Sequence, residues 1–188
     1  MPDADTLVFA VPKGDLDALP LAAAPILAAG ASASRFTGEA GTSFESFVQE
    51  GGATLRVLLL GTGAGNEQDM EKAGGALVAK LATSGAVHAA VEFFGGASGE
   101  RAAQLAFGAR LRGWRIDTYR TRQPEKAKPT LKTITLVATG ADAAWDRLTA
   151  VAAGVAFTRE LVAEPANILY PESFVERCRH LEELGVRI

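Results

Sequence analysis

The chain has 188 residues, of which 48% are hydrophobic and 22% charged, as in a globular protein long enough to bury one sizeable core. A net charge of −3 argues against a protein dedicated to nucleic acid, and a single cysteine, Cys178, excludes an internal disulfide. Residues 1–5 lack a signal-peptide pattern and no apolar run approaches ~18–20 residues, so we expect a cytoplasmic protein without a membrane partner.

The first third of the chain predicts one strand and less regular structure after it. Residues 6–11 form a short apolar run ended by Pro12, which indicates a buried strand. Residues 15–30 are rich in alanine and leucine but broken by two prolines, which leaves a short helix or an irregular turn open. Residues 35–44 combine glycine, threonine and phenylalanine in the manner of a bent hairpin.

The clearest strand is residues 54–60, which are apolar almost without interruption and therefore fit a strand covered on both faces. A glycine-rich turn follows, and Asn66 is a good N-cap for the next helix, with Asp69 three residues on. The apolar positions of that helix recur at helical spacing. They are Met70, Ala73, Gly74, Leu77, Val78 and Leu81.

Strands and helices go on alternating in the second half. Residues 86–94 and residues 131–138 each predict a strand. Ser98 should cap a helix between them, whose inward-facing residues are Ala102, Leu105, Ala106 and Ala109. After that helix, residues 114–119 are extended and residues 121–129 form a polar loop. A long helix should cover about 142–161. This order predicts an α/β fold, a three-layer αβα sandwich with a mainly parallel mixed sheet.

The segment 161–174 should form an elbow between two helices. Pro165 should end or bend the long helix, and Pro171 suits the first turn of the next one. That last helix should present an apolar stripe and end at Gly185. The stripe is Phe174, Cys178, Leu181 and Leu184.

This elbow resembles the N–P/E–P–A–N–x–L–x–P signature of the leucyl aminopeptidase (cytosol aminopeptidase) family. The matching residues are Arg159, Leu161, Glu164, Pro165, Ala166, Asn167, Leu169, Pro171 and Phe174. Residues 35–44 resemble the family's F–T–G–K–x–G–E–T segment in part, with Glu39 where lysine is usual, and residues 114–119 resemble its Y–x–F–D–x–Y–K segment. The resemblance covers nearly the whole chain, most clearly residues 54–182.

The resemblance implies a macrodomain-like N-terminal domain over residues 1–163 and a linker helix over 164–188 that leads toward a catalytic domain. The whole enzyme would release N-terminal amino acids from peptides with two divalent ions, zinc or manganese, within a hexamer. This domain would support assembly and active-site access. The family's catalytic motifs, such as N–T–D–A–E–G–R, do not occur in the chain, so we assign it no catalytic, cofactor-binding or metal residue and expect it to be inactive alone.

The glycine turn at Gly61, Gly63 and Gly65 keeps a second hypothesis open. A turn between a strand and a helix can cradle a phosphate on backbone N–H groups, as a macrodomain-like module that binds ADP-ribose or another nucleotide would require. The motif departs from G-x-G-x-x-G, because Asn66 takes the last position and no acidic residue stands ~20 positions on. Glu92 lies farther along, so a plain tight turn remains the alternative.

The remaining candidates are histidine, cysteine and a basic segment. His88 and Glu92 should share one face of a strand, which is too few ligands for zinc, and Cys178 and His180 should point in different directions from a helix. We expect His88 and Cys178 to be packed and His180 to be at the surface. Eight cations would suit a DNA-binding accessory domain or simply face water. They are Arg110, Arg112, Arg115, Arg120, Arg122, Lys126, Lys128 and Lys132, with Trp114 and Tyr119 among them.

Overall fold

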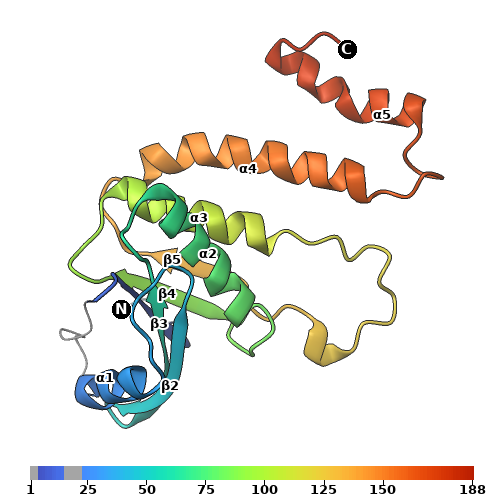
Figure 1. Cartoon of the computed structure of the whole chain (residues 1–188). Helices are drawn as coiled ribbons and strands as arrows, with labels where there is room; N and C mark the ends of the chain where they lie inside the picture. The colour runs from blue at the N-terminus through green and yellow to red at the C-terminus, as the bar shows by residue number, and fades with distance from the viewer. Residues whose placement is uncertain (1–3, 15–22) are drawn as a thin grey trace.

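The computed structural model describes residues 4–14 and 23–188 and contains a five-stranded sheet with strand order β2-β3-β1-β4-β5 (Figure 1). The strands are β1 (Thr6–Val11), β2 (Ser43–Glu50), β3 (Ala53–Gly61), β4 (His88–Phe93) and β5 (Thr133–Leu136). β2 and β3 are antiparallel and every other pair is parallel. β1 lies at the centre, and all six of its residues are buried, as its apolar run predicts.

The helices are α1 (Ala24–Ala33), α2 (Glu67–Leu81), α3 (Gly99–Gly113), α4 (Ala141–Ala163) and α5 (Pro171–Cys178), with 3-10 turns η1 (Glu125–Ala127) and η2 (Arg179–Leu184). α1 covers one face of the sheet through Leu27 and Ala31, while α2 and α3 cover the other (Figure 1). The αβα class is therefore confirmed. α4 packs on α3 through Leu148 and Ala152 and forms a further layer outside the sandwich.

Small residues bring α2 and α3 into backbone contact. A Cβ added to Gly74 of α2 would lie 1.9 Å from the carbonyl oxygen of Leu105, and one added to Gly108 of α3 would lie 1.9 Å from the carbonyl oxygen of Glu71. All six residues of the apolar stripe that the sequence predicts for α2 are buried. The helix pair therefore forms one tightly packed wall of the core.

The hairpin of this fold is β2–β3, so the prediction of a bent hairpin at residues 35–44 is wrong. β2 and β3 are joined at Gly51 and Gly52, whose φ angles of 57° and 84° suit a two-residue hairpin turn. Residues 35–42 instead form a loop over the end of β3, where the Gly41 amide donates to the Gly61 carbonyl at 3.0 Å. The glycines of this segment turn the chain before strand pairing begins.

The helical alternative for residues 15–30 is confirmed from Ala24 onward, with Pro25 in the first turn of α1, while residues 15–22 lie outside the described residues. The segment 114–119 has no strand pairing and continues into a turn. The predicted strand at 131–138 pairs only over the four residues of β5. These differences lie at the edges of the sheet, where few contacts fix the backbone.

The C-terminal elbow forms as its prolines predict. α4 ends at Ala163, and Glu164 is extended because Pro165 follows it. Pro171 is the first residue of α5, and Gly185 ends η2 with a φ of 84°. Of the residues in the predicted apolar stripe, Cys178 is buried, while Phe174 and Leu184 are exposed at the surface. The backbone tightens to a 3-10 turn after Cys178, so the spacing of Leu181 and Leu184 departs from that of an α-helix.

Candidate functional site

The glycine turn after β3 is filled by the protein itself. The carboxylate of Asp69 accepts the backbone N–H of Ala64 at 2.8 Å and the side-chain N–H of Asn66 at 3.1 Å. In return, the side-chain oxygen of Asn66 accepts the backbone N–H of Asp69 at 3.0 Å, which caps α2 as predicted. An anion bound here would have to displace this carboxylate.

The amides of Gly63 and Gly65 in the turn are also hydrogen-bonded within the protein. The Gly63 amide donates to the Gly38 carbonyl at 2.9 Å, and the Gly65 amide donates to the Thr62 carbonyl at 3.0 Å. The loop at Gly38 closes over the turn, and a Cβ on Gly63 would lie 2.5 Å from Asp69 Oδ2. The geometry favours a strand-to-helix turn over a phosphate cradle. The sequence gives Asp69 as part of a capping pair, but its reach to Ala64 depends on the positive φ of Gly63.

His88 and Glu92 lie on the same face of β4, as predicted, and both are half-buried. The His88 ring bonds through Nε2 to the hydroxyl of Thr135 on β5 at 2.8 Å, so it ties the edge strand to the sheet. Cys178 is buried and His180 is exposed, both as predicted. The His180 ring lies edge-on to the Phe157 ring, with the two ring centroids 4.8 Å apart. These residues do not come together as one site.

The described residues contain no group of three or more histidine, cysteine, aspartate or glutamate side chains that could hold a metal ion. Zinc in a hydrolase takes three protein ligands, and a two-metal centre needs several converging carboxylates. The described residues therefore do not fit a catalytic metal pair, and the expectation that this chain holds no metal site stays a prediction.

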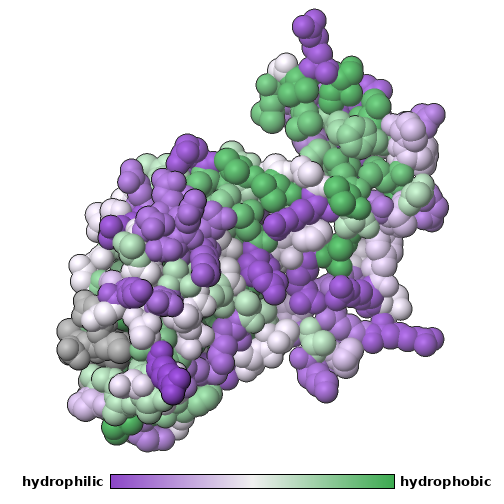
Figure 2. All heavy atoms as spheres, in the orientation of Figure 1, coloured by the Kyte–Doolittle hydropathy of each residue, from purple (hydrophilic) through white to green (hydrophobic). Residues whose placement is uncertain are grey.

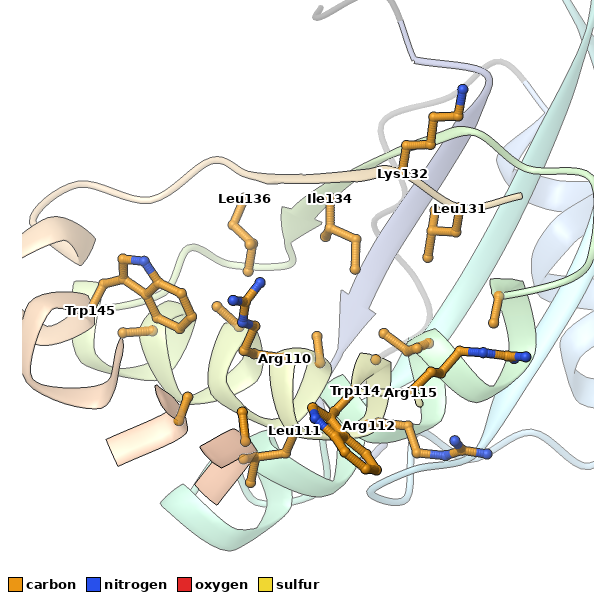
Figure 3. A pocket seen from close by; sticks show the side chains of 18 of the residues that line it. Arg110, Leu111, Arg112, Trp114, Arg115, Leu131, Lys132, Ile134, Leu136 and Trp145 are labelled. Carbon is orange, nitrogen blue, oxygen red and sulfur yellow. The ribbon is translucent and has the colours of Figure 1, made fainter. Parts of the chain in front are cut away.

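A groove of about 690 Å³ lies between α3, α4 and β5, and we call it the α3–β5 groove (Figure 3). Its floor is formed by Ile134 and Leu136 of β5, which face α3, and alanines of α3 leave the space open. Trp145 of α4 stands at one end and Trp114 at the other. Neither the groove nor its open edge follows from local sequence patterns, because it depends on α4 packing against α3 and leaving β5 uncovered.

Part of the predicted basic cluster borders this groove. Arg110, Arg112, Arg115 and Lys132 are among its lining residues. Two cations of the predicted cluster, one of them at the groove, are paired locally: Arg115 bonds Asp117 at 2.8 Å, and Lys128 bonds Glu125 at 2.6 Å. The ion pair with Arg115 holds the pKa of the Asp117 carboxyl below its usual value. Because these cations are already paired with carboxylates, they give the DNA hypothesis no support.

The elbow between α4 and α5 is held by a polar cluster around Glu164. Its carboxylate, 14% exposed, accepts the hydroxyl of Tyr119 and lies 3.6 Å from the guanidinium of Arg177 on α5. The hydrogen bond to this carboxylate raises the pKa of Tyr119. The elbow thereby connects the loop after α3 to the last helix. Glu164 belongs to the elbow signature, but its partner Tyr119 is 45 residues away and carries no local signal.

The family model described as "Cytosol aminopeptidase family, N-terminal domain" matches residues 10–123. The chain belongs to this family. Among its relatives are a probable cytosol aminopeptidase of Caulobacter vibrioides, 37% identical over 168 residues, and one of Afipia carboxidovorans, 37% identical over 166 residues. The matches cover 86% and 84% of this chain but only 34% and 33% of those proteins. The chain thus spans about a third of the length of the curated relatives it matches.

Solved structures show the same fold for this N-terminal domain of the cytosol aminopeptidase family. A tomato leucine aminopeptidase superposes with a TM-score of 0.75 at 23% identity over 96% of this chain and 40% of its own. The bottromycin maturation enzyme BotP, in a complex with Mn, superposes with a TM-score of 0.74 at 23% identity. That match covers 97% of this chain and 37% of BotP. The family resemblance carried by the elbow and the strand-helix order is confirmed.

Both bacterial relatives are named probable cytosol aminopeptidases. No helix in the described part of the chain combines the length and apolar character of a membrane span.

Proposed function

We propose that this chain is the non-catalytic N-terminal domain of a metalloaminopeptidase that releases N-terminal amino acids from peptides in the cytoplasm. One observation carries the proposal: the chain matches a family model of an N-terminal domain, and it spans about a third of the length of its relatives. The absence of a metal cluster among the described residues agrees with a catalytic centre located elsewhere. Two divalent ions, zinc or manganese, would be held by the rest of the protein.

The C-terminal elbow supports a division into a domain over residues 1–163 and a linker over 164–188. α4 leads out of the folded body, and α5 projects beyond it (Figure 1). Apolar side chains gather along α5 and the adjoining end of α4 (Figure 2). The exposed ones are Val162, Ile168, Tyr170, Phe174, Val175, Leu184, Val186 and Ile188. Contiguous apolar surface of this kind marks an interaction site.

The catalytic part of the longer protein is the partner that best fits this surface. The linker leaves the domain at Pro165, and the Glu164 cluster fixes the direction in which α5 leaves. A catalytic domain that follows in sequence would cover the apolar residues of α5. Through this contact the domain would support a hexamer and limit access to the active site.

The test uses this chain beside a chain extended through the natural reading frame. Leucine-anilide hydrolysis with added manganese or zinc should occur in the extended chain and not in the 188-residue chain. Hydrolysis by the 188-residue chain would remove the non-catalytic assignment, and an inactive, well-folded extended chain would remove the peptidase assignment.

A further inference from the structure

We propose that the α3–β5 groove binds the C-terminal end of an extended, apolar peptide. Three independent features of the groove carry this inference: an open strand edge, an apolar floor and a cation that points inward. The site goes beyond the peptidase proposal, because a peptide held by its C-terminus need not be a substrate. It would stand if the longer protein cleaved nothing.

The first feature is the free edge of β5. In the described part of the chain β5 is the last strand of the sheet and pairs only with β4. The amides of Thr133 and Val137 donate toward β4, to Val87 and Val91 at 3.2 and 3.3 Å. Because amides alternate in direction along a strand, those of Ile134 and Leu136 point away from β4. They offer donors and acceptors to an added strand.

The second feature is the apolar floor below that edge. Ile134 and Leu136 face α3, where Ala102 and Ala106 leave room between strand and helix, and Trp145 closes one end (Figure 3). Alternate side chains of a peptide paired with β5 would point into this space. The volume of about 690 Å³ lies within the range of sites that enclose small ligands. The groove therefore selects apolar residues at every second position.

The third feature is Arg110. Its guanidinium projects from α3 into the groove toward Leu136 (Figure 3). Arg110 is exposed, and among residues 4–14 and 23–188 no carboxylate lies within ion-pair distance of it. Asp142 is the one acidic residue among the lining residues. Lys132 points away from the groove, and Arg115 is already paired with Asp117. A guanidinium beside apolar surface takes a carboxylate with two parallel hydrogen bonds, which a terminal carboxylate satisfies.

The binding test uses a peptide that cannot be a substrate. An N-acetylated peptide of alternating serine and leucine, ending in a leucine carboxylate, is titrated into the 188-residue chain by calorimetry. We expect saturable one-to-one binding. The same peptide with a C-terminal amide should bind about tenfold more weakly, because it lacks one charge-assisted hydrogen-bond pair. A peptide methylated on the backbone nitrogens that face β5 should lose binding. Equal binding of all three peptides, or none, would overturn the proposal.

Variants then locate the site. Arg110→Gln should weaken binding of the carboxylate peptide about tenfold and leave the amide peptide unchanged. Arg122→Gln, an exposed arginine outside the groove, is the matched control and should change neither. Ala106→Trp should fill the groove and abolish binding of both peptides, with circular dichroism checking that the fold is kept. Unchanged binding in Arg110→Gln contradicts the assignment of the carboxylate.

Two other occupants are distinguished in the same experiments. If dodecanoate competes as well as the peptide does, the groove takes any anionic amphiphile and strand pairing plays no part, which contradicts the proposal. If the free chain sediments as a dimer that Ala106→Trp dissociates, a second copy occupies the groove, and the peptide proposal fails.

Discussion

Gly74→Ala should destabilise the domain, because a methyl group at this position would enter the backbone of α3. The added Cβ would lie 1.9 Å from the carbonyl oxygen of Leu105 and 2.7 Å from the amide nitrogen of Ala109. Both atoms belong to a helix backbone, so α2 and α3 would have to separate. Overpacking of this kind costs up to about 3 kcal/mol, and the higher helix propensity of alanine returns about 1 kcal/mol.

The net loss is therefore about 2 kcal/mol in the free energy of unfolding. For a chain of this length that lowers Tm by about 4–8 °C. Gly75→Ala is the matched control, because the nearest atoms to its added Cβ are 3.9 Å and 4.0 Å away. It should raise the free energy of unfolding by about 0.5–1 kcal/mol through helix propensity alone. Urea and thermal unfolding measure both, and equal stability of the two variants would refute the backbone contact between α2 and α3.

Three further predictions concern the cap, the N-terminal strand and the glycine turn. Asn66→Ala should cost about 1 kcal/mol in urea unfolding through loss of the α2 cap, and an unchanged midpoint would contradict the capping bond to Asp69. Partial burial acts to raise the pKa of Asp5, but hydrogen bonds from the Val87 amide and the Thr6 hydroxyl outweigh it and lower that pKa. A lowered folded-state pKa gives stability that is present above the unfolded value of about 3.9 and is lost as pH falls through the folded value. The stability difference between wild type and Asp5→Asn should therefore shrink below about pH 4, and a difference that grows there would contradict this sign. ADP-ribose at millimolar levels should leave Tm unchanged, since the Asp69 carboxylate fills the glycine turn; a rise in Tm that grows with ADP-ribose concentration would restore the nucleotide hypothesis.

Local sequence patterns predict α2 well because its structure is decided locally. The Asn66 side chain caps the helix by accepting the Asp69 amide, and one apolar stripe faces the sheet. The elbow is equally local, because Pro165 and Pro171 fix where one helix ends and the next begins. The strand-helix order then restricts the fold to a mainly parallel sandwich.

The features that local patterns do not predict depend on contacts between distant segments. The Gly51-Gly52 pair is a hairpin signal, but the polar residues of β2 hide the strand before it because β2 is an edge strand. α4 packs on α3 and leaves β5 open, which no single helix pattern reveals. The bond from Tyr119 to Glu164 joins residues 45 apart. The candidate groove arises from that same long-range packing.

The most direct test of the proposed function is metal-supported leucine-anilide hydrolysis by the 188-residue chain and by the chain extended through its natural reading frame. Both are assayed with manganese and with zinc, after unfolding curves show that each is folded. We predict hydrolysis by the extended chain alone. Hydrolysis by the 188-residue chain, or none by a folded extended chain, would contradict it.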